Sequence, residues 1–147
     1  MRRFIIGLYA SFVVVATASG LDTREHYSKT EVMIPMRDGV SLFTIVYEPK
    51  EQSEKHPILL VRTPYSIAPY GLDNYREQLG PSVLFDEDGF IFVFQDVRGK
   101  YRSEGEFVVM RPYRPEDTTN ESTDNYDTIE WLINNLENHN GTSCLHE

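Results

Sequence analysis

The chain has 147 residues, of which 40% are hydrophobic and 25% charged, so it fits one globular domain or part of one. Fourteen basic and 23 acidic residues give a formal net charge of -9, and no basic cluster lies beyond the first three residues. Because proteins that bind nucleic acid or anionic lipid need clustered Lys and Arg, we expect neither as a partner.

The first 18 residues have the pattern of a secretory signal peptide. A basic pair, Arg2 and Arg3, precedes the largely apolar run 4–15. Ala16-Thr17-Ala18 follows, with small residues at the positions that a signal peptidase reads. We therefore predict cleavage after Ala18, a secreted or periplasmic protein, and no membrane contact after cleavage. A membrane anchor is the alternative, but the run is shorter than the ~20 apolar residues that cross a bilayer.

The first structural elements predicted are two antiparallel strands. Residues 19–29 are polar and predict a flexible N-terminus of the mature chain. Apolar and polar residues then alternate over 30–36, and residues 40–47 form an apolar, β-branched run. Arg37-Asp38-Gly39 lies between the two runs. An Asp-Gly pair in this setting is a strong signal for a β-hairpin.

Two later runs are apolar without alternation, at residues 58–61 and 90–94. Strands of this kind are buried on both faces and belong to parallel sheets that are covered by helices. The 28 residues from 62–89 are enough for a crossover between them. Within this crossover, residues 73–79 and 82–86 are candidate helical turns.

The last predicted element is an amphipathic helix. It follows a polar surface loop over 99–123 that is rich in Gly, Pro and Arg. Apolar residues at helical spacing predict the helix over 124–138, with Asp124 capping its first turn and Gly141 beyond its end. Only 142–147 follow, and we expect no further strand. The order predicts an incomplete α/β fold, in which a mixed sheet has an N-terminal antiparallel hairpin followed by parallel strands and crossover helices.

Ligands of open α/β sheets bind beyond the carboxyl ends of the strands. Two predicted strands end there in Arg62-Thr63-Pro64-Tyr65 and in Gln95-Asp96-Val97-Arg98-Gly99. On the residues alone, Tyr65 is simply a tyrosine at a strand end. Asp96 and Arg98 are expected to pair with each other and hold the following loop, which is a structural role.

Three other features carry weaker signals. Asp86-Glu87-Asp88 lacks the spacing of a calcium loop, so we predict a solvated acidic turn. Cys144 is the single cysteine, and with His146 it has too few neighbours for a metal site, so we expect an unpaired thiol. Asn120 and Asn140 begin glycosylation sequons, which matter only if the source is a eukaryote.

Five segments, in this order, carry a resemblance to a known family. They are Ile34-Pro35-Met36-Arg37-Asp38-Gly39-Val40-Ser41-Leu42, Leu60-Val61-Arg62-Thr63-Pro64-Tyr65, Gln95-Asp96-Val97-Arg98-Gly99, Ser103-Glu104-Gly105-Glu106-Phe107 and Tyr126-Asp127-Thr128-Ile129-Glu130-Trp131-Leu132. Together they resemble the N-terminal part of the X-Pro dipeptidyl-peptidase and cocaine-esterase-like family of α/β serine hydrolases (CocE/NonD, peptidase S15-like). The resemblance covers about residues 31–141, and five segments in order are specific.

This resemblance implies an enzyme that hydrolyses small-molecule esters or peptides by acyl transfer to water, with no metal or organic cofactor. It also implies a catalytic role for Tyr65. As the tyrosine of the Thr-Pro-Tyr segment, Tyr65 would donate its hydroxyl to the oxyanion hole, where charge develops in the transition state. The resemblance leaves open the substrate and the oligomeric state.

The family's nucleophile stands on a Gly-x-Ser-Tyr-x-Gly elbow that follows the next strand, and this sequence has no Gly-x-Ser-x-Gly. Gly141-Thr142-Ser143 begins like the elbow, but Leu145 occupies the last glycine position. His139 and His146 do not match the family's histidine. The chain alone therefore lacks the catalytic triad and is expected to be inactive.

We divide the chain into a signal peptide (1–18), a flexible N-terminus (19–29), the N-terminal part of an α/β-hydrolase domain (30–141) and an aberrant tail (142–147). A truncated version of a hydrolase is the first interpretation. The alternatives are a secreted, non-enzymatic α/β fragment that binds a partner, and a pseudoenzyme.

Overall fold

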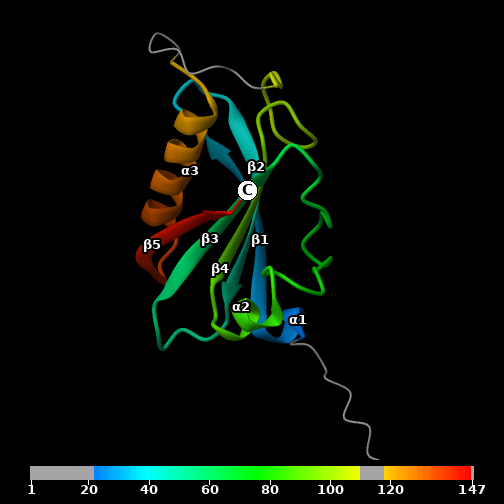
Figure 1. The fold of residues 1–147 in the computed structure, drawn as a ribbon, viewed down its shortest axis with the longest axis vertical. Coiled ribbons are helices and arrows are strands. Elements are labelled where there is room, and N and C mark those ends of the chain that lie inside the picture. Colours follow the sequence, from blue (N-terminus) through cyan, green and yellow to red (C-terminus); the bar gives the residue numbers. More distant parts are fainter. Residues whose placement is uncertain (1–21, 110–117, 147) are drawn as a thin grey trace, which may run out of the picture.

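The structure, a computed structural model, describes residues 22–109 and 118–146. Its helices are α1 (Thr23–His26), α2 (Val83–Glu87) and α3 (Glu121–Asn135), and its strands are β1 (Tyr27–Pro35), β2 (Ser41–Pro49), β3 (His56–Thr63), β4 (Ile91–Asp96) and β5 (His139–His146). The five strands form one sheet in the order β1-β2-β4-β3-β5 (Figure 1). The predicted signal peptide lies outside the described residues. Within them, no helix has the length and apolarity that a membrane crossing requires.

The sheet confirms the predicted mixture of antiparallel and parallel pairing. β1 and β2 form an antiparallel hairpin in which Pro35 lies opposite Ser41. Gly39 occupies its turn with φ +84°, a conformation that costs glycine little. β2 then pairs antiparallel with β4, and β4 pairs parallel with β3. The chain has the predicted α/β class.

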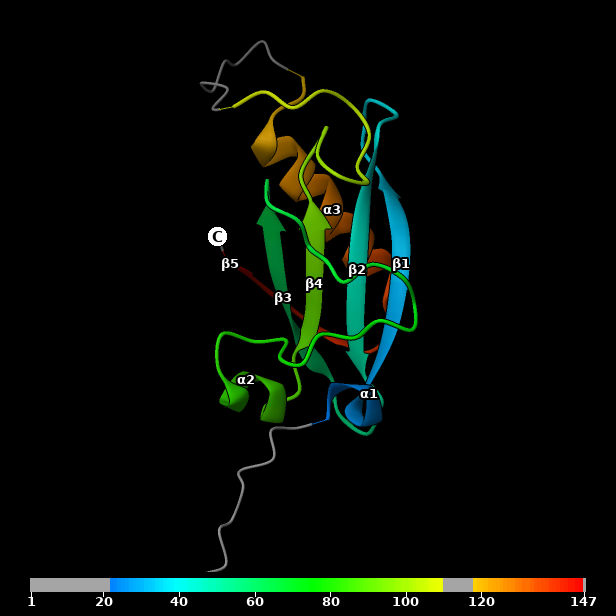
Figure 2. The same cartoon turned by 90° about the vertical axis from the view of Figure 1, so that its right-hand side faces the viewer.

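Both faces of the sheet are covered, and alternate residues of β4 serve the two faces. Phe92 and Phe94 pack in a cluster that includes Ile67 from the crossover. Ile91 and Val93 belong to the opposite cluster with Leu132 of α3. Figure 2 shows the crossover in front of the strands and α3 behind them. This is the burial on both faces that an apolar run without alternation predicts.

The crossover from β3 to β4 contains less helix than expected. Residues 82–86 overlap the short helix α2, but residues 73–79 are not helical. The ammonium group of Lys29 contributes to the difference, because it binds the carbonyl oxygen of Asn74, which a helix over 73–79 would have used internally. Its Nζ donates to the carbonyls of Pro69, Gly71 and Asn74 at 2.8, 2.8 and 2.7 Å. The Lys29 side chain is fully buried.

Replacing Lys29 with Met should lower the free energy of unfolding by about 2–3 kcal/mol, because three backbone carbonyls then lose a charged donor. Met keeps an unbranched apolar side chain, so the lost hydrogen bonds dominate the effect. The exposed Lys50, which donates to the Arg24 carbonyl at 2.8 Å, provides the control. Urea unfolding of Lys50→Met should stay within about 0.5 kcal/mol of wild type. Equal losses in both variants would contradict a special role for Lys29.

Helix α3 begins earlier than predicted, because Asn120 and not Asp124 is its N-cap. Asn120 Oδ1 accepts from the Thr123 backbone N–H at 3.0 Å, and Thr123 Oγ1 accepts from the Asn120 N–H at 2.8 Å, which completes a capping box. Asp124 is buried, and its carboxylate accepts hydrogen bonds from Arg98 instead. The predicted capping role of Asp124 is therefore wrong, and this carboxylate pairs with a distant arginine.

Strand β5 corrects the expectation that no strand follows the helix. Residues 139–146 run parallel to β3, with Ser143 opposite Ile58 and His146 opposite Val61. The segment is mostly polar and contains Gly141 at φ +80°, so its own sequence carries no strand signal. The segment forms a strand because its backbone pairs with β3. The sheet on which α3 packs is therefore not missing its next strand.

A further contact joins α3 to the hairpin turn. The backbone N–H of Arg37 donates to Asp127 Oδ2 at 2.9 Å, and its guanidinium donates to Oδ1 at 2.6 Å. This guanidinium holds the pKa of Asp127 below its usual range. The folded chain therefore keeps the carboxylate charged at a pH where the unfolded chain binds a proton.

Replacing Arg37 with Met should flatten the loss of stability in acid. The pair's contribution is fully present above the unfolded aspartate pKa of about 3.9 and is lost as the pH falls through the lower folded value. Urea unfolding at a series of pH values below about 6 measures this dependence. If wild type and Arg37→Met lose stability in parallel over that range, the Arg37–Asp127 pair does not stabilise the fold.

Candidate functional site

The parallel strands β3, β4 and β5 bring their carboxyl ends to one edge of the sheet. Thr63 lies opposite Asp96, and Val61 lies opposite His146. The arrowheads of β3 and β4 point to this edge at the top of Figure 2. The segments that follow β3 and β4 are therefore neighbours, as the sequence predicts. In open α/β sheets this edge is the place where ligands bind.

Tyr65 leaves β3 at this edge with its side chain 77% exposed. Its backbone N–H donates to Thr63 Oγ1 at 3.1 Å, so the turn after the strand is closed by a local hydrogen bond. The phenol is accessible to a group that approaches the carboxyl ends of the strands. Its role in an oxyanion hole stays a prediction.

Gln95, near the end of β4, points toward α3. Its side chain is fully buried, and Nε2 donates to Thr44 Oγ1 at 2.9 Å and to Thr128 Oγ1 at 3.0 Å. Its Oε1 accepts from Nε of Arg62 at 2.8 Å. One amide thus joins β2, β3 and α3. No local pattern in the sequence indicates these contacts of Gln95, although the alternation along β4 places it on the same face as Val93.

Asp96, the next residue, points to the opposite face. Its carboxylate is fully buried and accepts hydrogen bonds from the Tyr70 hydroxyl at 3.0 Å, the Ile67 N–H at 3.3 Å and the Arg102 N–H at 3.4 Å. Burial raises the pKa of Asp96, and these hydrogen bonds oppose that shift. The predicted pair of Asp96 with Arg98 is wrong, because β4 ends at Asp96 and the turn that follows carries the Arg98 side chain to Asp38 and Asp124.

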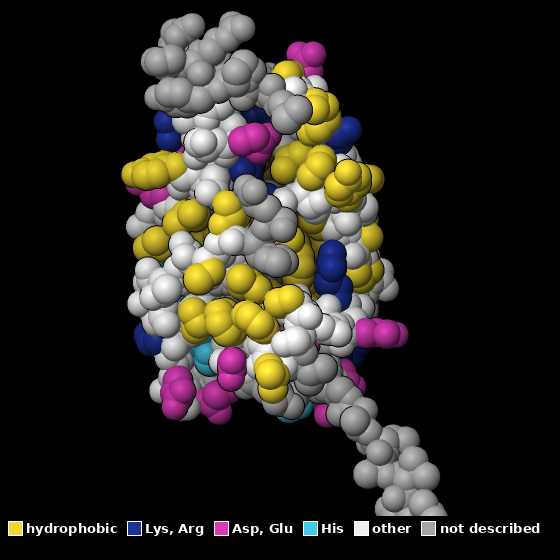
Figure 3. Space-filling model, viewed as in Figure 1, with side chains coloured by type: hydrophobic (Ala, Val, Ile, Leu, Met, Phe, Trp, Pro, Cys, Tyr) yellow, Lys and Arg dark blue, Asp and Glu magenta, His cyan; other side chains and the backbone are white. Residues whose placement is uncertain are grey.

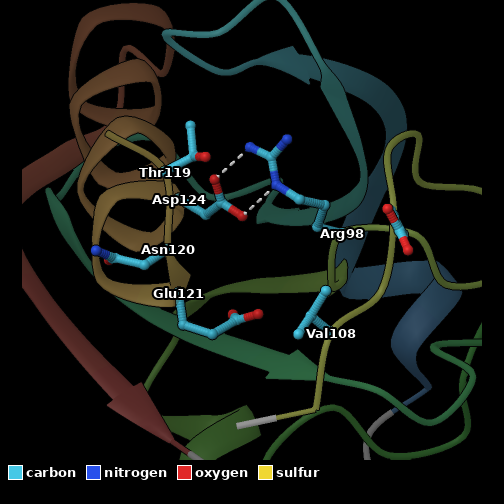
Figure 4. A pocket seen from close by; sticks show the side chains of 7 residues that line it. Arg98, Val108, Thr119, Asn120, Glu121 and Asp124 are labelled. Atoms are coloured by element: carbon cyan, nitrogen blue, oxygen red, sulfur yellow. Dashed lines mark hydrogen bonds and ion pairs between the residues drawn. The ribbon is translucent and has the colours of Figure 1, made fainter. Parts of the chain in front are cut away.

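Arg98 instead forms a structural joint between three elements. Its guanidinium donates to Asp124 of α3 at 2.6 and 3.0 Å and to Asp38 of the hairpin turn at 2.7 Å. Figure 4 shows the Arg98–Asp124 pair in a small hollow that Glu121 and Val108 also line. Both carboxylates raise the pKa of Arg98, so it stays charged. Asp38 and Asp124 neutralise its charge. Arg98 therefore has the structural role that was predicted, but its partners are Asp38 and Asp124 and not Asp96.

Arg62 extends the joint beneath the start of α3. Its side chain is only 7% exposed, and Nη1 donates to the Glu121 carbonyl at 3.0 Å and lies 3.2 Å from the Glu121 carboxylate. Within residues 22–109 and 118–146, its buried Nη2 has no hydrogen-bond partner. Burial lowers the pKa of Arg62. The sequence placed Arg62 at the edge but indicated none of these contacts.

Other residues considered for catalysis lie elsewhere. Gly141-Thr142-Ser143 belongs to β5 itself, with Ser143 opposite Ile58, and not to a turn beyond the strand. His139 begins β5 opposite His56, and its Nε2 bonds to the Ile133 carbonyl at 3.0 Å. The structure therefore brings neither Ser143 nor His139 to the carboxyl edge with Tyr65.

Hydrophobic side chains gather on one face of the molecule. Figure 3 shows them spread across the face that is seen in the view of Figure 1, from the lower centre to the upper right. Leu84 of α2 and Leu145 of β5 are 67% and 45% exposed.

Comparison with known proteins gives the family. The sequence profile of the X-Pro dipeptidyl-peptidase (S15 family) matches residues 38–145. The match extends past Gly141, where the resemblance by motifs ended. The cocaine esterase of Rhodococcus sp. (strain MB1 Bresler) is 36% identical over 104 residues, which are 71% of this chain and 16% of that protein.

Solved structures agree with the sequence match. An alpha-amino acid ester hydrolase superposes with a TM-score of 0.72 at 37% identity, over 92% of this chain and 23% of the other. An aminopeptidase from the marine sediment archaeon Thaumarchaeota archaeon gives a TM-score of 0.68 at 34% identity, over 97% and 24%. The chain thus spans between 16% and 24% of the length of these relatives. It belongs to the X-Pro dipeptidyl-peptidase (S15) family of hydrolases.

Proposed function

We propose that this chain forms the oxyanion-hole part of a serine hydrolase that cleaves carboxylic esters or peptide amides. The observation that carries the proposal is the position of Tyr65. Its exposed phenol follows β3, and β3 pairs directly with β5 at the edge where the strands end. In α/β hydrolases the nucleophile stands on a sharp turn above the sheet, and the loop after the third strand contributes to the oxyanion hole.

The chemistry assigned to Tyr65 is donation of one hydrogen bond. When a serine attacks the substrate carbonyl, negative charge develops on the carbonyl oxygen, and a donor already in place stabilises that charge. The serine and the histidine that moves its proton would come from outside the residues described here. We therefore expect no turnover from the 147 residues alone.

The substrate class follows from what the relatives have in common. Their names describe an esterase, an amino acid ester hydrolase and an aminopeptidase. Esters and amides both pass through a tetrahedral oxyanion, so one phenol donor serves either reaction. The reaction is acyl transfer to water, and Tyr65 acts on the oxygen of the acyl group.

A chimeric enzyme tests the proposal. Residues 31–141 of this chain would replace the equivalent segment of the alpha-amino acid ester hydrolase, to which the chain is 37% identical. The assay is hydrolysis of an amino acid ester, together with labelling by a fluorophosphonate probe of active serines. We expect the chimera to label and to turn over. A chimera that melts cooperatively and labels, yet shows no turnover, would count against the proposal.

In this chimera, Tyr65→Phe should lower kcat about 100- to 1000-fold and leave KM nearly unchanged, because the lost hydrogen bond forms only in the transition state. Tyr126→Phe is the matched control, since Tyr126 is 60% exposed on α3, and it should keep full activity. Fluorophosphonate labelling should persist in both variants. If Tyr65→Phe retains wild-type kcat, Tyr65 is not part of the oxyanion hole.

A further inference from the structure

We propose that Asp96 is a positioning residue for Tyr65. Its buried carboxylate fastens the backbone immediately after Tyr65 to the end of β4 and so sets where the phenol stands. The catalytic meaning of this inference rests on the proposed function, whereas the positioning itself does not.

Asp96 contacts the segment after Tyr65 directly at Ile67 and, through the Tyr70 hydroxyl, at Ser66. Oδ1 accepts from the backbone N–H of Ile67 at 3.3 Å. Both carboxylate oxygens accept from the Tyr70 hydroxyl, at 3.0 and 3.4 Å, and that hydroxyl also lies 3.1 Å from Ser66 Oγ. Ser66 and Ile67 are thus both connected to one carboxylate. On the other side, Tyr65 is tied to Thr63, the last residue of β3.

The loop around Tyr65 is exposed at its tip and anchored at its base. Tyr65 and Ser66 are exposed, whereas Ile67 is fully buried in the cluster that covers Phe92 and Phe94. Asp96 therefore binds the first buried residue after Tyr65, which is Ile67. Lys29 holds the same crossover further along, at residues 69–74, where its influence on Tyr65 is less direct.

Stability of the fold does not by itself require a carboxylate at position 96. Asp96 is fully buried, and in the part of the chain that the structure describes it forms no ion pair. A buried charge without a counter-charge is costly, and an apolar side chain would continue the packing of Phe92 and Phe94. What a carboxylate offers instead is acceptor capacity for several donors from one point.

Asparagine is the informative replacement, because it has the same shape but one acceptor oxygen fewer. Oδ1 of Asp96 faces the Ile67 N–H, and Oδ2 faces the Arg102 N–H. Whichever way the asparagine amide is turned, its NH₂ group meets a backbone donor. Asp96→Asn should therefore loosen the loop without creating a cavity.

Hydrogen exchange in the full 147-residue chain tests the positioning directly. We expect the Ile67 amide to exchange about tenfold faster in Asp96→Asn, with amides of α3 unchanged. Asp38→Asn is the control, because Asp38 pairs with Arg98, and it should leave Ile67 unaffected. Tyr70→Phe keeps the buried acid but removes one donor, so it should give a smaller increase, and it serves if Asp96→Asn does not fold. Unchanged Ile67 exchange in both Asp96→Asn and Tyr70→Phe would overturn the proposal.

A double-mutant cycle in the chimera separates positioning from general stability. Asp96→Asn should lower kcat with little change in KM, and it should add no further loss in the Tyr65→Phe background. Losses that add would mean that Asp96 acts independently of Tyr65 and would overturn the proposal. An inactive chimera would count against the proposed function, while the exchange experiment would still decide whether Asp96 holds the loop.

Discussion

The whole structure depends on the burial of β4. All six of its residues are buried, between the antiparallel β2 on one side and the parallel β3 on the other. A strand in this position must offer apolar side chains to both faces, so it needs a covering layer on each. The chain meets this need with one regular layer, helix α3, and one irregular layer, the crossover that contains Ile67 and Leu79.

The polar residues at the end of β4 continue the same two-sided pattern. Gln95 takes the α3 face, where it contacts Thr128, and Asp96 takes the crossover face, where it contacts Ile67 and Tyr70. The strand thus changes from apolar packing to hydrogen bonding where it reaches the carboxyl edge. A hydrogen bond fixes a distance and a direction more narrowly than apolar contact does. Such contacts fix the positions of the segments that follow β3 and β4 at this edge.

Much of the fold could be predicted from the sequence, because its strongest signals are local. The Asp-Gly turn and the apolar runs of β3 and β4 give the sheet its hairpin and its buried centre. The start of α3 is harder to predict, since Asp124 and Asn120 are both acceptable caps, and the capping box with Thr123 and the contact of Asp124 with Arg98 decide for Asn120. Strand β5 is not predictable from its own residues, because it depends on pairing with β3, which is distant in the sequence.

The candidate site was harder to predict than the fold. Tyr65 was identified through the resemblance alone, because an exposed tyrosine after a strand has no distinctive pattern. The partners of Asp96 and Arg98 are not predictable from neighbouring residues, since Tyr70, Asp38 and Asp124 are all distant in the sequence. Alternation along β4 predicts that Gln95 and Asp96 lie on opposite faces of the sheet, but it does not predict which distant residues they contact.

The alternation at the end of β4 has a consequence for how related chains can differ in length. Inserting or deleting one residue within 91–96 would exchange the faces of every residue beyond the change. The amide of Gln95 would then meet the crossover, and the carboxylate of Asp96 would meet α3. The exposed turn over 50–55, between β2 and β3, carries no such restriction. Gaps in an alignment of relatives should therefore fall in that turn and spare β4.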